Sequence, residues 1–281
     1  MPKNFFITGN PLYVRDSSMI ITLLICGLIT GVLSSFFGVG GGMVIVPPLY
    51  FLFPEYPHTM VIGTSLGVIF VNGLLNTYLY YKKKTPINKR LLMLIAPGMM
   101  IGAYIGSLAA KNFETITIKI LLAFILVVVG LRLILKKKSD KEKQEVIPEI
   151  SAPLLLGTGL LGGTVSGTTG LGGGAVLTPM LIEVGKAPIH LIPAHNNIMK
   201  VLAALVGIVQ ALTYTTPDSI PYAQYCLGHL NYFIIFIMFI GSNIGIRIGI
   251  YTIHKIEQRT AEILFSILLI GVSSKILYST L

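Results

Sequence analysis

Long stretches without a charged residue constrain the fold of this chain more than any other feature of its sequence. Several of them exceed the roughly 20 apolar residues that an α-helix needs to cross a bilayer. They cover residues 17–54, 56–81, 91–110, 150–182 and 219–246. Only 11% of all residues are charged, against roughly 25% in soluble domains. Because the stretches are continuously apolar, whereas the strands of a membrane barrel alternate in polarity, we predict an all-α integral membrane protein.

The formal net charge of +10 does not indicate a nucleic-acid partner. The basic residues lie in short loops beside apolar stretches, where contact with lipid headgroups and orientation during membrane insertion account for them. Cys26 and Cys226 lie too far apart in the chain to indicate a disulfide framework or a metal cluster. We find no paired carboxylates and no nucleophile motif, so we expect neither an enzyme nor a bound cofactor. The first apolar stretch is too long for a cleaved signal peptide, and we expect it to be retained.

A duplication spans nearly the whole sequence. Residues 27–49 align without gaps on residues 159–181 at an offset of 132, with 11 of 23 positions identical. The shared positions include Gly31 with Gly163, Ser34 with Ser166, and Pro47 with Pro179. A second match, at an offset of 143, pairs Gly98, Gly102 and Gly106 with Gly241, Gly245 and Gly249.

The duplication divides the chain into an N-terminal tail (1–18), a first membrane repeat (19–135), a charged linker (136–150) and a second membrane repeat (151–281). Each repeat begins with an apolar stretch interrupted by glycines. Three predicted membrane helices follow in each repeat, at 59–81, 91–110 and 115–135, and at 192–213, 228–250 and 260–279.

The charges in the loops predict that the two repeats have opposite orientations in the membrane. Loop 82–90 holds five Lys and Arg residues, whereas the corresponding loop 214–227 holds none. Conversely, loop 183–190 of the second repeat contains Lys186, whereas the corresponding loop 54–58 of the first repeat contains no Lys or Arg. Since cytoplasmic loops accumulate Lys and Arg, we place loop 82–90, the linker, loop 183–190 and segment 251–259 on the cytoplasmic side. Inversion requires an odd number of crossings, so each glycine-interrupted stretch is expected to enter and return, as a re-entrant hairpin or as two short spans.

Three consecutive glycines in an apolar stretch are expected to break the helix at membrane depth. A short helix should follow each break, with a proline close to its start. Helix N-termini bind anions, and transporters with inverted repeats use them in this way near the midplane. The alternative is that the glycines only permit close helix packing. The substrate-binding residues predicted at the breaks are Ser34, Ser35, Gly40, Gly41, Gly42, Ser166, Thr168, Thr169, Gly172, Gly173 and Gly174.

Polar side chains inside the predicted helices supply a second group of candidates. The substrate-binding candidates are Thr64, Ser65, His195, Asn196, Asn197 and Lys200, and the secondary candidates are Asn72, Asn76, Asn243 and Arg247. No Asp or Glu lies deep in any predicted span, which favours a bound anion as the counter-charge of a buried cation. The alternatives are that Arg247 reaches the headgroups and that His195 is a neutral, hydrogen-bonded histidine.

The paired pattern GxxxGxxSxxxGxGGGxxxxPxL and the GTSLG run at 63–67 resemble the TauE/SafE family of membrane transporters, often called sulfite exporters. The resemblance implies a prokaryotic plasma-membrane carrier of a sulfur-containing anion, such as sulfite, a sulfonate or sulfoacetate. It also implies coupling to a proton or cation gradient. Ala194, His195, Asn196 and Asn197 stand where the first repeat has its Gly-Thr-Ser run, which leaves the substrate open. An anion channel, a membrane protein without transport activity, and a homodimeric state also stay open.

Overall fold

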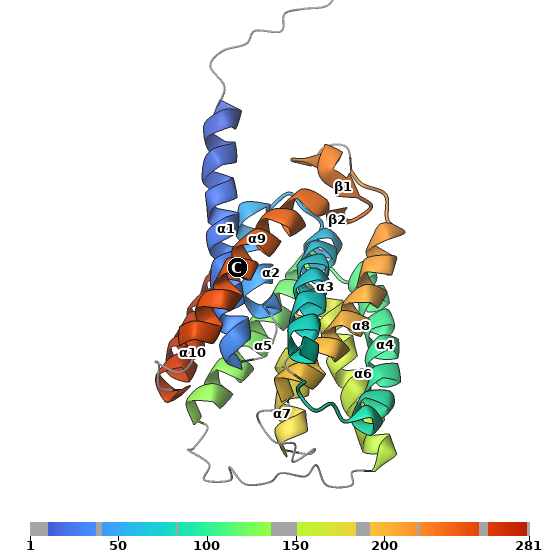
Figure 1. Cartoon of the computed structure of the whole chain (residues 1–281). Coiled ribbons are helices and arrows are strands. Elements are labelled where there is room, and N and C mark those ends of the chain that lie inside the picture. The colour runs from blue at the N-terminus through green and yellow to red at the C-terminus, as the bar shows by residue number, and fades with distance from the viewer. Residues whose placement is uncertain are drawn as a thin grey trace, which may run out of the picture.

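The computed structural model describes residues 11–37, 41–82, 84–135, 151–183, 192–217, 220–252 and 258–279. Over these ranges the chain forms a bundle of ten α-helices (Figure 1). The first half contains α1 (Pro11–Phe37), α2 (Gly42–Leu52), α3 (His58–Lys82), α4 (Lys89–Asn112) and α5 (Thr115–Leu135). The second half contains α6 (Ala152–Thr169), α7 (Gly174–Glu183), α8 (Ile192–Leu212), α9 (Tyr232–Thr252) and α10 (Gln258–Tyr278). A short antiparallel hairpin of β1 (Cys226–Leu227) and β2 (Leu230–Asn231) connects α8 to α9.

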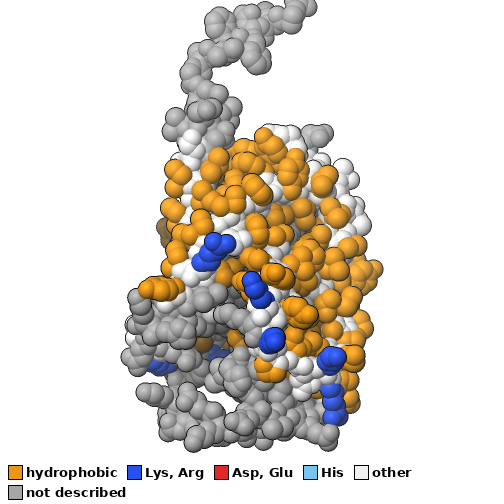
Figure 2. All heavy atoms as spheres, in the orientation of Figure 1, with side chains coloured by type: hydrophobic (Ala, Val, Ile, Leu, Met, Phe, Trp, Pro, Cys, Tyr) orange, Lys and Arg blue, Asp and Glu red, His pale blue; other side chains and the backbone are white. Residues whose placement is uncertain are grey.

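The surface of the bundle is hydrophobic, as expected where helices face lipid. Figure 2 shows one face covered mostly by hydrophobic side chains, with Lys and Arg toward its lower half. Phe124, Phe236 and Leu264 are 65%, 62% and 62% exposed. Within the described residues, six helices are long and apolar enough to cross a bilayer. The chain is therefore a multi-pass membrane protein.

The six membrane helices predicted to follow the glycine-interrupted stretches agree with the structure to within a few residues at most ends. They correspond to α3, α4, α5, α8, α9 and α10. The largest difference is at α9, which begins at Tyr232 and not at 228. The reason is that Asn231 ends the hairpin and its Oδ1 accepts a hydrogen bond of 3.0 Å from the backbone of Ile234, a typical helix N-cap. In addition, α1 begins at Pro11, within the segment predicted to be the N-terminal tail. The predicted linker, 136–150, lies outside the described residues.

The glycine-interrupted stretches each form a long helix followed by a short one that turns back against it. Gly173, directly before α7, packs closely against the backbone of Gly162 in α6, and Gly41 packs against Thr30 in α1. The expectation that the prolines lie close to the helix starts was wrong. Pro47 and Pro179 lie in the interiors of α2 and α7, where a proline removes an intrahelical hydrogen bond.

Two pairs of helices pack through glycines with their backbones in close contact. In each contact the missing side chain leaves room for a carbonyl of the partner helix. The glycines are Gly98, Gly102 and Gly106 of α4, packed on α6, and Gly241, Gly245 and Gly249 of α9, packed on α1. The contacts advance in the same direction along both helices, so each pair is parallel. Since α1 and α4 belong to the first half and α6 and α9 to the second, the two halves interlock.

The centre of the bundle is formed by α3 and α8, which run antiparallel. Gly63 near the start of α3 packs against Ala211 near the end of α8, whereas Gly73 packs against Val201. These two helices correspond to each other in the duplication. Both helices bury polar residues, among them Ser65 and Asn72 of α3 and Asn196 and Lys200 of α8.

The helices α5 and α10 form a second antiparallel pair of corresponding helices. Gly130, near the end of α5, packs against Ile270 of α10. The guanidinium group of Arg259, near the start of α10, donates hydrogen bonds of 2.8 Å to the carbonyl of Leu133 and 2.6 Å to that of Ile134. Because the last carbonyls of a helix have no intrahelical donor, Arg259 satisfies two groups at the end of α5.

Candidate functional site

The two glycine-rich breaks meet at the centre of the bundle. Gly42, the first residue of α2, packs so closely against the backbone of Leu171 that a Cβ there would clash with it. Leu171 lies in the second break, between α6 and α7. In this break Gly172 and Gly173 have φ angles of 77° and 69°, a left-handed conformation that glycine adopts without strain. The irregular backbone at membrane depth is thus buried inside protein, as a bilayer requires.

A small cavity lies beside the first break, between α1, α3, α8 and α9. Its polar lining consists of Ser34, Asn72, Asn76, Asn197 and Lys200, and Gly41 lies at the start of α2. Gly31, Gly73, Ile69 and Ile246 complete the wall. We call this space the Lys200 cavity. It encloses about the space of one water molecule, so a larger occupant requires the surrounding helices to move.

Lys200 is the cation of this cavity. Its side chain is only 1% exposed, on a helix that is otherwise mostly apolar. Asn197 lies one turn earlier, and residues three apart on a helix share a face. The described residues of the lining include no Asp or Glu. The cavity therefore combines a buried lysine side chain with neutral hydrogen-bonding groups.

Hydrogen bonds fix the orientation of two asparagines in the wall. The hydroxyl of Ser242 in α9 donates to Oδ1 of Asn72 over 2.7 Å. This bond turns the Asn72 amide so that its nitrogen is the end left to donate. The amide nitrogen of Asn197 donates to the carbonyl of Pro193 over 2.8 Å. Ser242 was not predicted from the sequence, because it has no motif and acts through Asn72.

Other predicted residues on α3 and α8 make structural hydrogen bonds. Ser65 donates to the carbonyl of Gly170 over 2.8 Å, and Thr64 accepts from the backbone of Asn231 over 3.1 Å. His195 accepts at Nε2 from the backbone N–H of Asn88 over 2.9 Å. That bond requires an unprotonated Nε2, in agreement with the alternative of a neutral histidine. None of Thr64, Ser65 and His195 lines the Lys200 cavity.

Most of the remaining candidates lie outside the lining of this cavity. Asn196 donates to the hydroxyl of Thr178 over 2.6 Å, and its own Oδ1 is buried without a partner among the described residues. Ser35, Thr168 and Thr169 donate to carbonyls of the preceding helical turn. The other candidates outside the lining are Gly42, Ser166, Gly172, Gly173, Gly174, Asn243 and Arg247. Arg247 is exposed on α9, as expected for a side chain that reaches the headgroups, and Gly40 lies outside the described residues.

Comparison with known proteins identifies the family. The sequence model described as "Sulfite exporter TauE/SafE" matches residues 23–276. This chain belongs to the TauE/SafE family. A "Probable membrane transporter protein" of Haemophilus influenzae is 29% identical over 200 residues, 70% of this chain and 73% of the relative. YunE of Bacillus subtilis, with the same description, is 26% identical over 92% of this chain and 97% of the relative.

A third relative comes from an archaeon. A probable membrane transporter protein of Methanocaldococcus jannaschii is 29% identical over 88% of this chain and 91% of the relative. No solved structure matches the chain. Together with the apolar helices, the family and these relatives make this TauE/SafE protein a membrane transporter, as the glycine pattern predicted.

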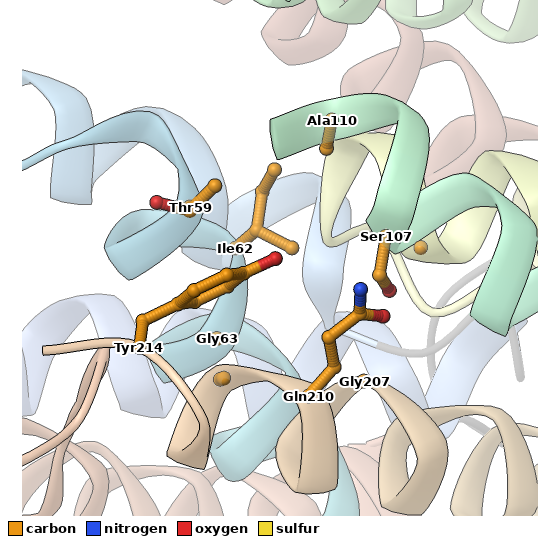
Figure 3. A pocket seen from close by; sticks show the side chains of 10 residues that line it. Thr59, Ile62, Gly63, Ser107, Ala110, Gly207, Gln210 and Tyr214 are labelled. Atoms are coloured by element: carbon orange, nitrogen blue, oxygen red, sulfur yellow. The ribbon is translucent and has the colours of Figure 1, made fainter. Parts of the chain in front are cut away.

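A second hollow of this TauE/SafE protein, which was not predicted from the sequence, lies at the other end of the α3–α8 pair (Figure 3). Its polar residues include Thr59, Ser107, Gln210 and Tyr214. The sequence feature that could have indicated this hollow is Gln210, because its amide side chain interrupts the apolar end of α8. We call this space the Gln210 hollow. Among the described residues, no group of three or more His, Cys, Asp or Glu residues is placed to hold a metal ion.

Proposed function

We propose that this protein is a secondary transporter that moves a small sulfur-containing oxyanion, of the sulfite, sulfonate or sulfoacetate type, across the plasma membrane of a prokaryote. The observation that carries the proposal is the Lys200 cavity, in which one buried cation faces neutral donors and no described carboxylate. A basic side chain buried inside a membrane protein commonly serves a substrate or an ion. The description of the family supports a sulfur-containing substrate.

The start of α2 adds to the attraction for an anion. Gly41 lines the cavity, and its carbonyl accepts the first helical hydrogen bonds, from Val44 and Ile45, over 2.9 Å each. The N-terminus of α2 therefore points its positive dipole end toward the cavity. Together with Lys200 and the amides of Asn72 and Asn76, this arrangement suits the dispersed negative charge of an oxyanion.

We further propose that the two halves are inverted repeats and that the transporter works by alternating access. The antiparallel packing of α3 on α8 and of α5 on α10 supports inversion, because a two-fold axis in the membrane plane reverses corresponding helices. The hairpin β1–β2 and helix α7 lie at opposite ends of the bundle in Figure 1. The loop charges support an orientation with the hairpin outside the cell. The narrowness of the Lys200 cavity suits an occluded state, from which either side opens in turn.

Flux measurements on purified protein in proteoliposomes test the proposal. We expect saturable uptake of radiolabelled sulfite, sulfoacetate or thiosulfate, accelerated by unlabelled anion inside the vesicles. Such acceleration distinguishes a carrier from a channel. Only in a carrier must the binding site return across the membrane after each uptake step, and it returns faster when an anion inside the vesicle occupies it. Taurine, a zwitterion, and choline, a cation, serve as comparison substrates. A pH gradient imposed on the same vesicles tests proton coupling. The absence of saturable flux for every anion would contradict the proposal.

A further inference from the structure

The Gln210 hollow lies at the end of the α3–α8 pair opposite the Lys200 cavity. Gln210 and Gly207 of α8, Gly63 of α3, Ser107 of α4 and Gly167 of α6 contribute to its wall. Figure 3 shows the side chains of Ser107, Gln210 and Tyr214 pointing toward the same space. They come from two helices and the loop after α8, so they converge only in the folded protein.

Two polar atoms of this hollow are buried without a hydrogen-bond partner among the described residues. They are Oε1 of Gln210 and the hydroxyl of Tyr214. Gln210 is only 8% exposed. Since more than about 90% of buried polar groups in proteins are hydrogen-bonded, Oε1 of Gln210, which faces the hollow without a partner among the described residues, indicates a place for a hydrogen-bonding occupant. The hollow encloses about the space of one water molecule, so a larger occupant requires the surrounding helices to move. A glutamine amide presents either its oxygen or its N–H₂ group after a half-turn, so Gln210 can donate to an oxyanion or accept from a protonated one.

A cation stands at the mouth of the hollow. The Nζ atom of Lys111, at the exposed end of α4, lies 5.7 Å from the centre of the Tyr214 ring. The ring of His229 lies 4.8 Å from that of Tyr214 on the other side of the loop. An anion that approaches this end therefore meets a positive charge first and neutral hydrogen-bonding groups next.

The two spaces occupy corresponding places in the duplicated framework. The Lys200 cavity is bounded by α1, α9 and the second half of α3, and the Gln210 hollow by α6, α4 and the second half of α8. The duplication pairs α1 with α6, α9 with α4, and α3 with α8. The hollow is thus the counterpart, at the opposite end of the central helix pair, of the cavity that contains Lys200.

We propose that the Gln210 hollow is a second binding station for the transported oxyanion, at the end of the bundle that carries the β1–β2 hairpin. Gln210 and Tyr214 hydrogen-bond the anion there, and Lys111 attracts it to the mouth. The station lacks a buried cation among its described lining residues, so it holds the anion more weakly than the Lys200 cavity and passes it on. This inference rests on the proposed transport of an anion by this chain.

Transport from each side of the membrane tests the inference. Gln210→Leu removes the amide with little change in volume, and Tyr214→Phe removes one oxygen atom only. Tyr104→Phe, on the exposed face of α4, is the matched control. Initial rates of sulfite uptake are measured in right-side-out and in inside-out vesicles. We expect Gln210→Leu and Tyr214→Phe each to raise KM about tenfold from the hairpin side and to leave KM from the opposite side unchanged.

The outcomes separate this inference from the proposed function. An unchanged KM on the hairpin side, or an equal rise on both sides, overturns the second station while transport stands. No saturable flux in the wild-type protein overturns both proposals. If Gln210→Leu does not yield folded protein by size-exclusion chromatography, Tyr214→Phe carries the test, because a single hydroxyl leaves the packing intact. Lys111→Gln should raise KM from the hairpin side less at high salt than at low salt, since salt screens an exposed charge.

Discussion

The Lys200 cavity and the Gln210 hollow are framed by corresponding helices and lined by different chemistry. The cavity has a buried lysine and three asparagines, whereas the hollow has a glutamine and a tyrosine, with Lys111 beside the ring of that tyrosine. The difference shows that the duplication preserved the packing of the backbone while the side chains at the two ends diverged. Corresponding helices of the two halves thus carry different side chains at the two ends of the α3–α8 pair.

The largest expected effect comes from the residue that creates this asymmetry. Lys200→Met keeps the length of the side chain and removes its charge, and we expect anion flux to fall about 100-fold from either side. The measurement is the initial rate of uptake in proteoliposomes. Lys275→Met, which removes an exposed lysine of α10, should retain the wild-type rate. If Lys200→Met keeps more than about a tenth of the activity, the cavity is not the central site.

Substitutions of glycine test whether the framework itself is equivalent in the two halves. Gly31→Ala and Gly163→Ala occupy corresponding positions, and each new methyl group would press on the backbone of a partner helix. Overpacking of this kind costs about 1–3 kcal/mol, so both variants should lower the melting temperature by several degrees and by similar amounts. Gly157→Ala faces open space and should melt like the wild type. Destabilisation in only one half would show that the frameworks differ.

A smaller effect is expected from the hydrogen bond that orients Asn72. Ser242→Ala removes the donor to its Oδ1 and frees the amide to rotate. The loss of one hydrogen bond of about 1 kcal/mol should raise KM about fivefold. Ser274→Ala, at an exposed serine bonded only within its own helix, is the control. Equal KM values for the two variants would show that the orientation of the Asn72 amide does not affect substrate binding.

The smallest effect concerns His229, beside the Gln210 hollow. Burial lowers the pKa of His229 below its ordinary value of 6.5, although a hydrogen bond to the carbonyl of Thr215 opposes this shift and His58 adds to it. Below pH 6.5 the unfolded chain therefore takes up this proton more readily than the folded one, and stability falls as the pH drops. We expect the melting temperature to be lower at about pH 5.5 than at about pH 7.5.

The matched variant for this prediction is His229→Asn. It should show a smaller difference between the two pH values, because it lacks the titrating group. A difference as large as that of the wild type would assign the pH dependence to another residue.

The helices were predictable because their apolar stretches are long and their ends are marked by charged loops. The start of α9 was not, because the hairpin and the cap formed by Asn231 depend on contacts with Thr64 and Tyr56, distant in the sequence. The prolines of α2 and α7 were placed too close to the helix starts, since the last glycine of each run, Gly42 or Gly174, is already the first residue of the helix.

The candidate site was predictable in part for a related reason. Asn72, Asn76, Asn197 and Lys200 were candidates because they are polar residues within apolar helices, and the structure brings all four to one cavity. The sequence offered no means to distinguish His195 and Asn196 from these residues. Its role follows from the backbone of Asn88, more than a hundred residues earlier in the chain. The Gln210 hollow was missed because no repeated motif marks it.

The parallel glycine contacts also have a consequence for how the chain is made. When α6 emerges from the ribosome, its partner α4 has already been synthesised, so this pair can form at once. In contrast, α1 is made well before α9, residues Tyr232–Thr252, and must wait in the membrane until that helix is complete. During that interval its glycine face is open to lipid or to other proteins. The α1–α9 pair therefore forms only after most of the described helices have been made, and α1 stays without its partner for longer than α4 does.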